Sequence, residues 1–430
     1  MTQDCLNLWR NLVMTYETTK VRLADICKVN QGLQIPISGR FTTPGKDRYF
    51  YITIQFLKKN SDVAYYVDKP NNSVICKKDD ILVVRTGSTG VVLTGIEGCF
   101  HNNFFKVVPD KTKVNPRFLY YFLSSPKIYK KMQSLAGVTV IQDLSHSSFY
   151  RIEINLPSLN IQKKIVQILD AYTDKVNLNS DLIAALEEYS QLLFHKWFVD
   201  FNFPDENGQP YKDNGGEMYV VEEKEIPSSW NIEPLESFII NTSNGDWGEE
   251  IPFEGAVETY CIRGADIPKI KHGIVRGTPL RYIKRTKDNA KSLKDGNIVI
   301  EASGGSPTQS TGRTVLIRDS LLNNIDKPMY FSNFSKMIVP KNNYSMFLYL
   351  LFNNLFQRDV FFHFEGKTSG IRNLLLNNLI NKLEFVNPSI DVLKKFEEQI
   401  GLLWDKIFNL GYENEQLIET RDLIIKKLIK

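Results

Sequence analysis

Cysteine is scarce in this 430-residue chain, and the five cysteines form no CxxC pair. An odd number without paired spacing argues against a disulfide framework and against a cysteine zinc site. The five histidines are scattered as well, with no HExxH or similar metal-binding spacing. These absences predict a cytoplasmic protein from a reducing compartment, without a metal site.

Long apolar runs are also missing. No stretch approaches the roughly 20 apolar residues that span a bilayer. The opening MTQDCLNLWRNL has neither the basic start nor the apolar core of a secretory signal. A hydrophobic content of 42% and a charged content of 24% are ordinary for a globular protein. We therefore expect no membrane association.

The sequence lacks the motifs of common catalytic sites. It contains no GxxxxGK[ST] phosphate loop and no GxGxxG turn after a strand. Neither Asn115-Pro116 nor Asn387-Pro388 is followed by a second proline, so the Asn/Asp-Pro-Pro-aromatic motif of amino-methyltransferases is absent. We expect a non-catalytic chain that has no catalytic residues and no cofactor of its own.

What the chain does contain is a repeat. LPSLNIQKKIVQILDAYTDKV at 156–176 is similar to NPSIDVLKKFEEQIGLLWDKI at 387–407, and Pro157 matches Pro388. Further pairs keep the same order along the chain: 79–93 with 295–317, 102–109 with 332–340, 116–125 with 344–354, and 137–144 with 368–375. Ordered repetition of this kind predicts an internal duplication.

Each half has the same organisation. Short β-branched and aromatic runs, broken by Gly, Asn and Asp turns, are followed by a proline and a long helical segment. We predict an α+β fold, in which two pseudo-repeated α/β domains are joined by two long antiparallel helices as a coiled-coil spacer. The predicted boundaries are 1–157 for the first domain, 158–200 for the first long helix, 201–229 for an acidic linker, 230–386 for the second domain and 387–430 for the second long helix.

The long helices carry apolar residues at spacings of mostly three and four, as in helices that pack along one another. Asn177 and Asn179 interrupt the first stripe, so we expect a kink or a shift of register there. A helix of about 40 residues is about 60 Å long, which exceeds what the core of one domain requires. We therefore predict a rigid bar, although each helix could instead pack only on its own domain.

Positive charge concentrates in the two predicted domains. Residues 1–157 contain 21 Lys and Arg against 12 Asp and Glu, and residues 230–385 contain 19 against 16. Basic blocks favour a polyanionic partner. Two unlike basic domains on a spacer favour duplex DNA with two different half-sites. Surface solubility explains the weaker excess in the second domain about equally well.

These features resemble the specificity subunit of type I restriction–modification systems. The resemblance covers essentially the whole chain and rests on DDILVVRTGSTG, on LPSLNIQKKIVQILDAYTDKV with its continuation to LLFHKWFVDF, and on the EIPSSW entry to the second domain. It implies two target recognition domains that each read one half of a bipartite DNA sequence. It also implies two methyltransferase (modification) subunits, which carry S-adenosylmethionine and methylate adenine, and restriction subunits that complete the nuclease.

The expected DNA contacts lie mainly near turns. The turn at 85–90 is favoured because glycines let backbone amides approach a phosphate, and Arg85 can reach a phosphate or a guanine edge. The same glycines can equally serve the fold. The full set is Arg85, Thr86, Ser88, Thr89, Lys58, Lys77, Lys78, Arg281, Lys284, Arg285, Arg313, Lys367 and Arg372.

On the long helices, the residues expected to bind partner subunits are Gln162, Ile165, Trp197, Phe198, Phe396 and Trp404. Two alternatives stay open. One is the recognition subunit of a type IIB-like restriction–modification enzyme. The other is a protein-only helical scaffold that joins two peptide-binding modules. Salt separates the scaffold from a DNA-binding protein, because phosphate-dominated affinity falls steeply as salt rises.

Overall fold

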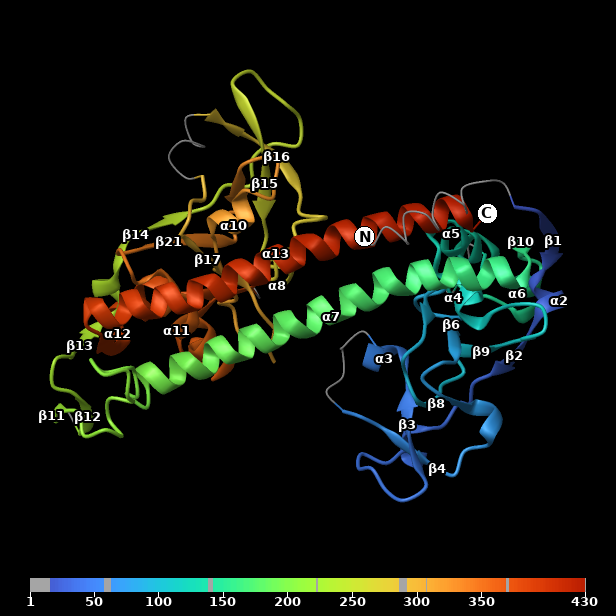
Figure 1. Cartoon of the computed structure of the whole chain (residues 1–430), viewed down its shortest axis with the longest axis horizontal. Helices are drawn as coiled ribbons and strands as arrows, with labels where there is room; N and C mark the ends of the chain where they lie inside the picture. Colours follow the sequence, from blue (N-terminus) through green and yellow to red (C-terminus); the bar gives the residue numbers. More distant parts are fainter. Residues whose placement is uncertain are drawn as a thin grey trace. The chain divides into compact units, whose positions relative to one another are not determined.

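The computed structural model describes residues 16–57, 63–137, 142–221, 223–285, 292–306, 308–368 and 371–429. The chain forms two compact units. Unit 1 comprises residues 1–174 and 417–430, and unit 2 comprises residues 175–416. Each unit has its own sheets, helices and buried core (Figure 1), so the expected mixture of helix and sheet is confirmed.

Unit 1 is built on two four-stranded sheets. The first has the order β2-β9-β6-β7 and the second the order β4-β3-β8-β5. Their strands are β2 (Cys27–Gln31), β3 (Arg48–Ile52), β4 (Tyr66–Asp68), β5 (Ile75–Cys76), β6 (Ile81–Val84), β7 (Val92–Leu93), β8 (Gly98–Phe100) and β9 (Phe104–Pro109). A separate antiparallel pair joins β1 (Thr18–Arg22) to β10 (Glu153–Pro157), which leads into the first long helix.

The helices of unit 1 begin at clear capping signals. The Asn115 side chain accepts the N–H of Arg117, and the Ser125 side chain accepts the N–H of Ile128. A proline follows each cap, where its missing N–H costs no intrahelical bond. The helices are α2 (Leu23–Ile26), η1 (Ile37–Gly39), α3 (Ile54–Leu57), η2 (Asn72–Val74), α4 (Pro116–Ser124), α5 (Pro126–Leu135) and α6 (His146–Tyr150).

Unit 2 repeats the strand pairing of unit 1. The sheet β14-β21-β17-β19 has the connectivity of β2-β9-β6-β7, and the β13–β24 pair corresponds to β1–β10. The parallel pairing of β15 with β20 corresponds to that of β3 with β8. The strands are β13 (Asn231–Pro234), β14 (Ile239–Asn244), β15 (Ala256–Ile262), β17 (Ile298–Glu301), β19 (Thr314–Leu316), β20 (Met329–Phe331), β21 (Ser335–Pro340) and β24 (Glu384–Asn387). The predicted duplication is thus confirmed in the topology.

Unit 2 also contains elements that its sequence repeat did not indicate. These form a three-stranded sheet β18-β23-β22, whereas β16 (Leu280–Lys284), which pairs antiparallel with β15, corresponds to β4 beside β3 in unit 1. The strands of this sheet are β18 (Ser303–Gly304), β22 (Glu365–Thr368) and β23 (Ile371–Leu374). The shorter helices of unit 2 are η3 (Leu235–Phe238), α8 (Ile267–Ile270), α10 (Asp319–Leu322), α11 (Ser345–Gln357), η4 (Val360–Phe364) and α12 (Leu376–Lys382).

The acidic segment at 201–229 is more ordered than an exposed connector. It contains the hairpin of β11 (Met218–Val221) and β12 (Lys224–Pro227). Phe203, which is 5% exposed, stacks on both Tyr211 and Trp230 with ring centroids 4.6 and 4.8 Å apart. Aromatic burial therefore anchors this segment to unit 2.

Both predicted long helices are present as α7 (Leu159–Phe198) and α13 (Ile390–Leu428). α7 is one continuous helix through Asn177 and Asn179 (Figure 1), and the kink or shift of register expected there stays a prediction. The Asn179 amide is buried and donates to Glu413 Oε2 at 2.8 Å and to Asn414 Oδ1 at 3.0 Å. A polar pair inside an apolar stripe fixes the register of two helices.

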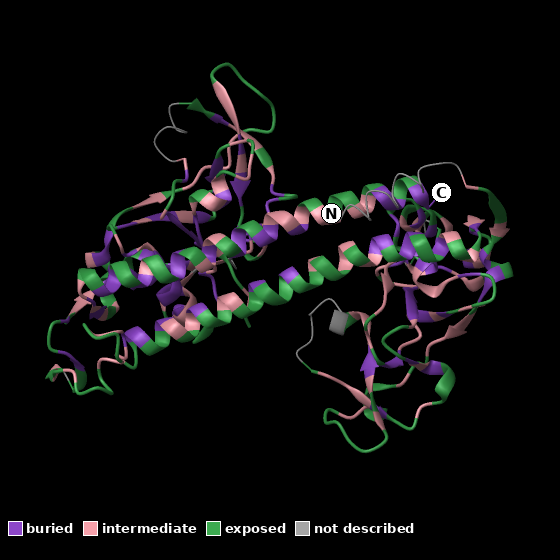
Figure 2. Cartoon of the chain, in the orientation of Figure 1, coloured by how far each residue is buried: buried purple, intermediate pink, exposed green. Residues whose placement is uncertain are grey.

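Within unit 2 the two helices run antiparallel. Trp197 packs against Phe396 with ring centroids 5.3 Å apart, whereas Asn179 binds Asn414. Residues with higher numbers on α7 therefore lie beside residues with lower numbers on α13, as in an antiparallel pair. Within unit 1, Ile424 of α13 belongs to the same core as the first turns of α7. Figure 2 shows buried positions recurring along both helices between exposed ones.

Candidate nucleic-acid interface

The turn that follows β6 is closed by its own backbone and side chains. Gly87 and Gly90 have φ values of +92° and +88°, a region that glycine adopts without strain. The Thr89 hydroxyl lies 3.0 Å from the Arg85 carbonyl and 3.2 Å from the Gln142 carbonyl. Thr89 is 3% exposed, so it stabilises the turn from inside and is not available to DNA, contrary to its prediction.

Arg85 leaves this turn and forms a bidentate ion pair with Asp143. Its Nη2 lies 2.7 Å from Asp143 Oδ2, its Nε binds Oδ1, and its Nη1 donates to Gln31 Oε1 at 3.2 Å. The hydrogen bond from Arg85 lowers the pKa of the Asp143 carboxyl, so the carboxylate stays charged. Three of the five guanidinium donors are thus used and two remain. The side chain is 31% exposed, so a ligand can reach it.

The same junction occurs in both units. Thr86 forms a β-bridge with Asp143 in unit 1, and Ser303 pairs with Asn373 in unit 2. One backbone hydrogen bond is also shared. The N–H of Leu144 donates to the carbonyl of Arg85 at 3.1 Å, and the N–H of Leu374 donates to the carbonyl of Ala302 at 2.9 Å. This geometry makes Asp143 equivalent to Asn373 and Leu144 to Leu374, so the ends of the predicted repeats 137–144 and 368–375 do correspond, but with the register shifted by one residue. Arg85 itself is replaced by alanine in unit 2.

Unit 2 holds two other arginines against buried carboxylates. Glu365 Oε2 lies 2.8 Å from Arg372 Nη1, and its Oε1 accepts the N–H and hydroxyl of Thr311. Glu301 Oε2 lies 2.8 Å from Arg313 Nε. The two carboxylate side chains are only 5% and 3% exposed, and charges so buried require partners. The arginine side chains remain 25% and 26% exposed.

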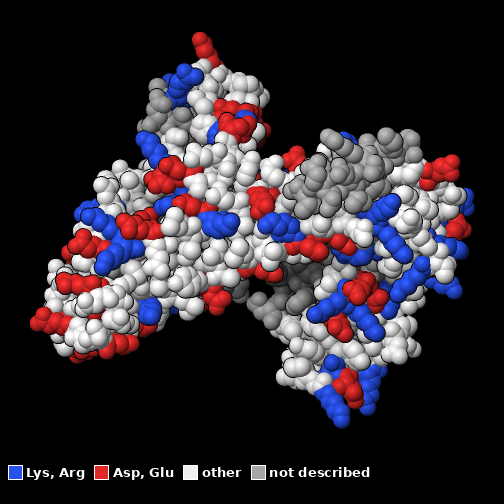
Figure 3. Space-filling view, viewed as in Figure 1, with Lys and Arg blue, Asp and Glu red and all other residues white. Residues whose placement is uncertain are grey.

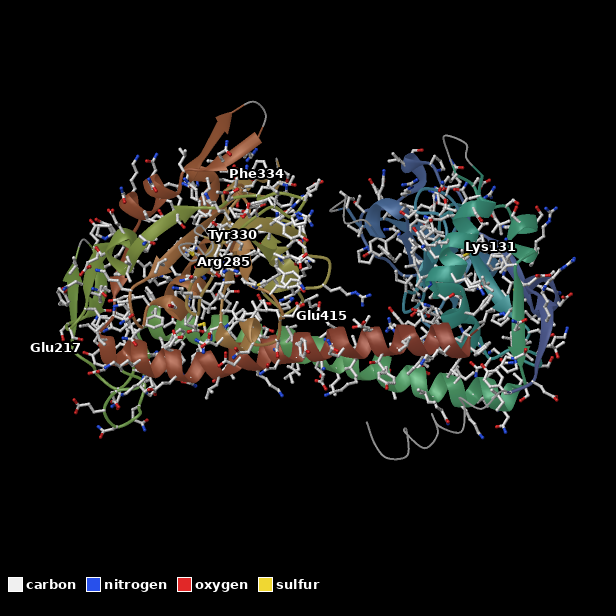
Figure 4. All side chains as sticks on the ribbon, turned by 90° about the horizontal axis from the view of Figure 1, so that it is seen from above. Lys131, Glu217, Arg285, Tyr330, Phe334 and Glu415 are labelled. Atoms are coloured by element: carbon white, nitrogen blue, oxygen red, sulfur yellow. The ribbon has the colours of Figure 1, made fainter. Side chains whose placement is uncertain are left out.

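The three DNA contacts predicted in and just after β16 differ in how far they are exposed. The Arg281 guanidinium lies over the Trp247 ring at 4.0 Å from the centroid and binds Glu250 at 2.7 Å. Its side chain is 12% exposed, so it mainly supports Trp247. Lys284 and Arg285 are exposed; Arg285 is labelled in Figure 4.

The remaining expected DNA contacts have mixed placements. Lys77 and Lys78 are exposed, and Thr86 and Ser88 are partly exposed. Lys58 and the side chain of Lys367 lie outside the described residues. These positions are compatible with phosphate contact, and their role stays a prediction.

The six residues expected to bind partner subunits lie inside the chain instead. Gln162 accepts the N–H of Asn115 at 2.7 Å and donates to the carbonyl of Pro157 at 2.8 Å, which ties α7 to the start of α4. Ile165 is in the core of unit 1. The other four, in the core of unit 2, are Trp197, Phe198, Phe396 and Trp404. None of the six is more than 3% exposed, so we assign them to packing rather than to a partner interface.

Sequence reasoning missed the carboxylates that orient the arginines. Asp143 is 58 residues from Arg85, and Glu365 lies in β22, which has no counterpart among the described strands of unit 1, so no local spacing indicates either pairing. It also missed Phe334, whose carbonyl accepts the N–H of Ser303 at 3.0 Å. Phe334 is 51% exposed and is labelled in Figure 4. Its equivalent in unit 1 is Asn103, because the carbonyl of Phe334 accepts the N–H of Ala302 as the carbonyl of Asn103 accepts the N–H of Arg85.

The described residues contain no group of three His, Cys, Asp or Glu side chains suited to a metal ion. In the same part of the chain, no helix combines the length and apolarity needed to cross a membrane. The cysteines that the structure describes, Cys27, Cys76, Cys99 and Cys261, are buried and free. What the arrangement offers is a set of oriented cationic side chains, which bind anions and hydrogen-bond acceptors.

Known proteins give this arrangement a context. Residues 16–188 match the family model for the type I restriction modification DNA specificity domain. The type I restriction enzyme MjaIX specificity subunit of Methanocaldococcus jannaschii is 24% identical over 89% of this chain and 84% of that protein. The HindI specificity subunit of Haemophilus influenzae is 24% identical over 86% of both.

A crystal structure shares the fold along nearly the whole chain. It is that of the S subunit of a type I restriction-modification system from M. genitalium, which covers 97% of both chains with a TM-score of 0.59 at 17% identity. Residues 16–188 thus match the DNA specificity domain of type I restriction–modification systems, and most of this chain is similar to type I restriction enzyme specificity subunits.

Proposed function

We propose that this chain recognises the DNA sequence for a type I restriction–modification complex, with one repeat reading each half of an asymmetric, bipartite target. The observation that carries this proposal is a shared topology with unlike side chains. Both units have the same junction after the corresponding strands β6 and β17, yet Arg85 of unit 1 faces Asp143 where unit 2 has Ala302 and Asn373. Related but different readers suit two different half-sites.

The clamped arginines are the groups that we propose read bases. An arginine recognises guanine through paired hydrogen bonds to O6 and N7 in the major groove. A carboxylate that holds one edge of the guanidinium limits its rotation and leaves further donors for the base. Arg85 has this arrangement in unit 1, and Arg372 and Arg313 have it in unit 2. Exposed lysines such as Lys77 supply phosphate contacts that fix position without reading sequence.

The predicted domains 1–157 and 230–386 serve as the target recognition domains in this proposal. The helices at 158–200 and 387–430 set the spacer between the half-sites and offer a docking surface to two methyltransferase subunits. Exposed leucines support such a surface better than the buried residues first expected: Leu178, Leu192, Leu402 and Leu423, each at least 49% exposed. The methyltransferase subunits bind S-adenosylmethionine and methylate adenine, restriction subunits cleave, and the complex acts in the cytoplasm.

Genome-wide mapping of methylated adenine tests this proposal. The chain is expressed together with the methyltransferase subunits of its own system in a host without other adenine methylation. We expect one motif made of two different half-sites separated by a constant number of unspecified bases. Methylation at a single continuous motif, or at half-sites without constant spacing, would contradict the proposal.

A further inference from the structure

A cavity of about 570 Å³ in unit 1 is lined mainly by cationic side chains. It lies between α5 and the β1–β10 pair, with α6 ending beside it. Its charged lining consists of Lys20, Lys127, Lys130, Lys131, Arg151 and one carboxylate, Glu153. Figure 3 shows basic side chains gathered over this end of unit 1, and Figure 4 labels Lys131.

The helix α5 presents its lysines on one face. Lys127, Lys130, Lys131 and Ser134 follow the spacing i, i+3, i+4 and i+7, which places them along one side of a helix. Met132, on the opposite side, is fully buried in the core. The lysines are exposed, so the fold does not need them for packing.

The cavity is not neutralised by the chain itself. Glu153 pairs with Lys20 at 2.8 Å. In the described part of the chain, no carboxylate lies within ion-pair distance of the three α5 lysines or of Arg151. Like charges grouped around a hollow repel one another, so the arrangement costs stability unless an anion occupies it.

We propose that this cavity binds backbone phosphates of the DNA outside the bases that unit 1 reads; the inference rests on the proposed function. Lysine is a compact point charge that binds phosphate without demanding planar geometry, whereas acidic peptides are usually recognised by arginine. The eight residues from Lys127 to Ser134 span about 10 Å, the axial length of about three phosphates on one strand. The site therefore positions the duplex and carries no base preference.

The site belongs to unit 1 alone. Aligning Phe118 with Phe347, as the repeat of 116–125 with 344–354 requires, places Phe356, Asp359 and Val360 where unit 1 has its three lysines. Unit 2 has η4 rather than a second basic helix at this place. The first half-site should therefore be held by more phosphate contacts than the second.

The test compares DNA binding by the complete methyltransferase complex with wild-type chain and with the K127Q/K130Q/K131Q variant. Glutamine keeps helix propensity close to that of lysine. We expect the negative slope of log affinity against log salt to become shallower by about 1 to 3, since each lost phosphate contact removes about 0.9 from its magnitude. Affinity should fall equally for the target and for targets with one changed base pair, so base discrimination stays unchanged.

A second variant, K28Q/K46Q/K111Q, controls for net charge, because it removes three exposed lysines of the same unit outside the cavity. It should change the salt slope much less. Duplexes with a single neutral methylphosphonate locate the contact: some positions next to the first half-site should weaken binding by the wild type and not by the cavity variant. An unchanged salt slope, or sensitivity only to free inorganic phosphate, would overturn the proposal.

The outcomes separate this inference from the proposed function. Loss of methyltransferase subunits from the cavity variant, measured by its mass in solution, would assign the cavity to a protein partner and reject the phosphate site. If the wild type methylates a bipartite motif but the cavity variant keeps its salt slope, only the cavity inference fails. If the wild type methylates no bipartite motif, the proposed function fails first.

Discussion

Arginine is held by a carboxylate near the same junction in both repeats, although the residues differ. In unit 1 the pair is Arg85 with Asp143, and in unit 2 it is Arg372 with Glu365. The carboxylate of unit 2 is the more buried one, at 5% against 40% exposure. Both repeats therefore hold an arginine with a carboxylate, but the carboxylates differ in burial and the neighbouring residues differ in sequence, which suits two different half-sites.

Replacing Asp143 with asparagine tests the reading role of Arg85. A neutral amide at this position cannot form the bidentate ion pair, so the guanidinium gains rotational freedom while its charge is kept. We expect relaxed discrimination at one base pair of the first half-site, by about 1–3 kcal/mol, the usual value of one bidentate base contact. Affinities for a set of targets with single base changes measure this.

The second repeat provides the matched control. Glu365→Gln should relax the second half-site and leave the first unchanged, because Glu365 binds Arg372 and Thr311 within unit 2. Protein stability is measured in parallel by chemical unfolding. A uniform loss of affinity at both half-sites in D143N, without any change in base preference, would show that the Arg85–Asp143 pair serves the fold only.

The sequence predicts single candidate residues within one segment better than it predicts which distant residues pair with them. Arg85 was identifiable from its position before a Gly-rich turn, and it is partly exposed as expected. Thr89 was not distinguishable from its neighbours, because only the fold shows its hydroxyl turned inward to two carbonyls. Asp143 carries no local signal, since its partner lies 58 residues away.

Among the elements, α13 makes one unusually close approach. Gly411 lies in the middle of this helix, and a Cβ built there would stand 1.7 Å from the carbonyl oxygen of His272. His272 and Lys271 are themselves held by Glu187 of α7. Burial would raise the pKa of Glu187, but the hydrogen bond from His272 and the charge of Lys271 outweigh it and lower the pKa to about 2. The loop at 271–273 is therefore fixed between both long helices.

Gly411→Ala should destabilise unit 2. Alanine favours an isolated helix by about 1 kcal/mol over glycine, but here its methyl group collides with backbone that Glu187 holds in place. We expect the free energy of unfolding to fall by roughly 1–3 kcal/mol, as for overpacked sites. Urea unfolding followed by tryptophan fluorescence measures this, since Trp197, Trp230 and Trp404 are buried in unit 2.

Gly401→Ala is the control in the same helix. A Cβ at Gly401 would meet the Nη2 atom of Arg318 at 3.1 Å, a side-chain atom rather than backbone and a much longer distance than at Gly411. Its effect on stability should be small. Equal effects of the two substitutions would mean that the approach at Gly411 is not the constraint that we infer.

The apolar stripes on the long helices were sufficient to predict both helices but not what covers them. Periodicity reports that a face is buried and is silent about whether the same chain or a partner buries it. Phe198 and Phe396 were assigned to partners, yet they pack on each other with ring centroids 4.8 Å apart. Likewise, Asn179 looked like an interruption because its partner Asn414 is 235 residues away.

For the whole molecule, the duplication was readable from the sequence because order, spacing and residue type all recur. The differences between the copies were less readable. The expanded loop after β17 contains β18 of the sheet β18-β23-β22, and the basic face of α5 has no second copy at the aligned positions. The two units share a topology but differ in their charged side chains, and this combination favours one fixed orientation of the chain on an asymmetric DNA target.

The spacer is the property that the long helices should control. Seven residues inserted after Asp174 and seven before Leu417, where the chain passes between its two units, keep each apolar stripe in phase, because seven residues make nearly two helical turns. They lengthen each helix by about 10 Å, roughly three base pairs at 3.4 Å each. We expect the methylated motif to keep both half-sites and to gain about three unspecified bases between them.

Seven residues inserted at the exposed turn around Gly208 provide the comparison, since that turn lies outside both helices. This insertion should leave the motif unchanged, so a general disturbance of the chain can be told from a change of helix length. The half-sites must stay the same in the helix variant, because both reading junctions lie outside α7 and α13. A helix variant that methylates with the original spacing would mean that the distance between half-sites is set elsewhere, and the helices would then be left with assembly alone.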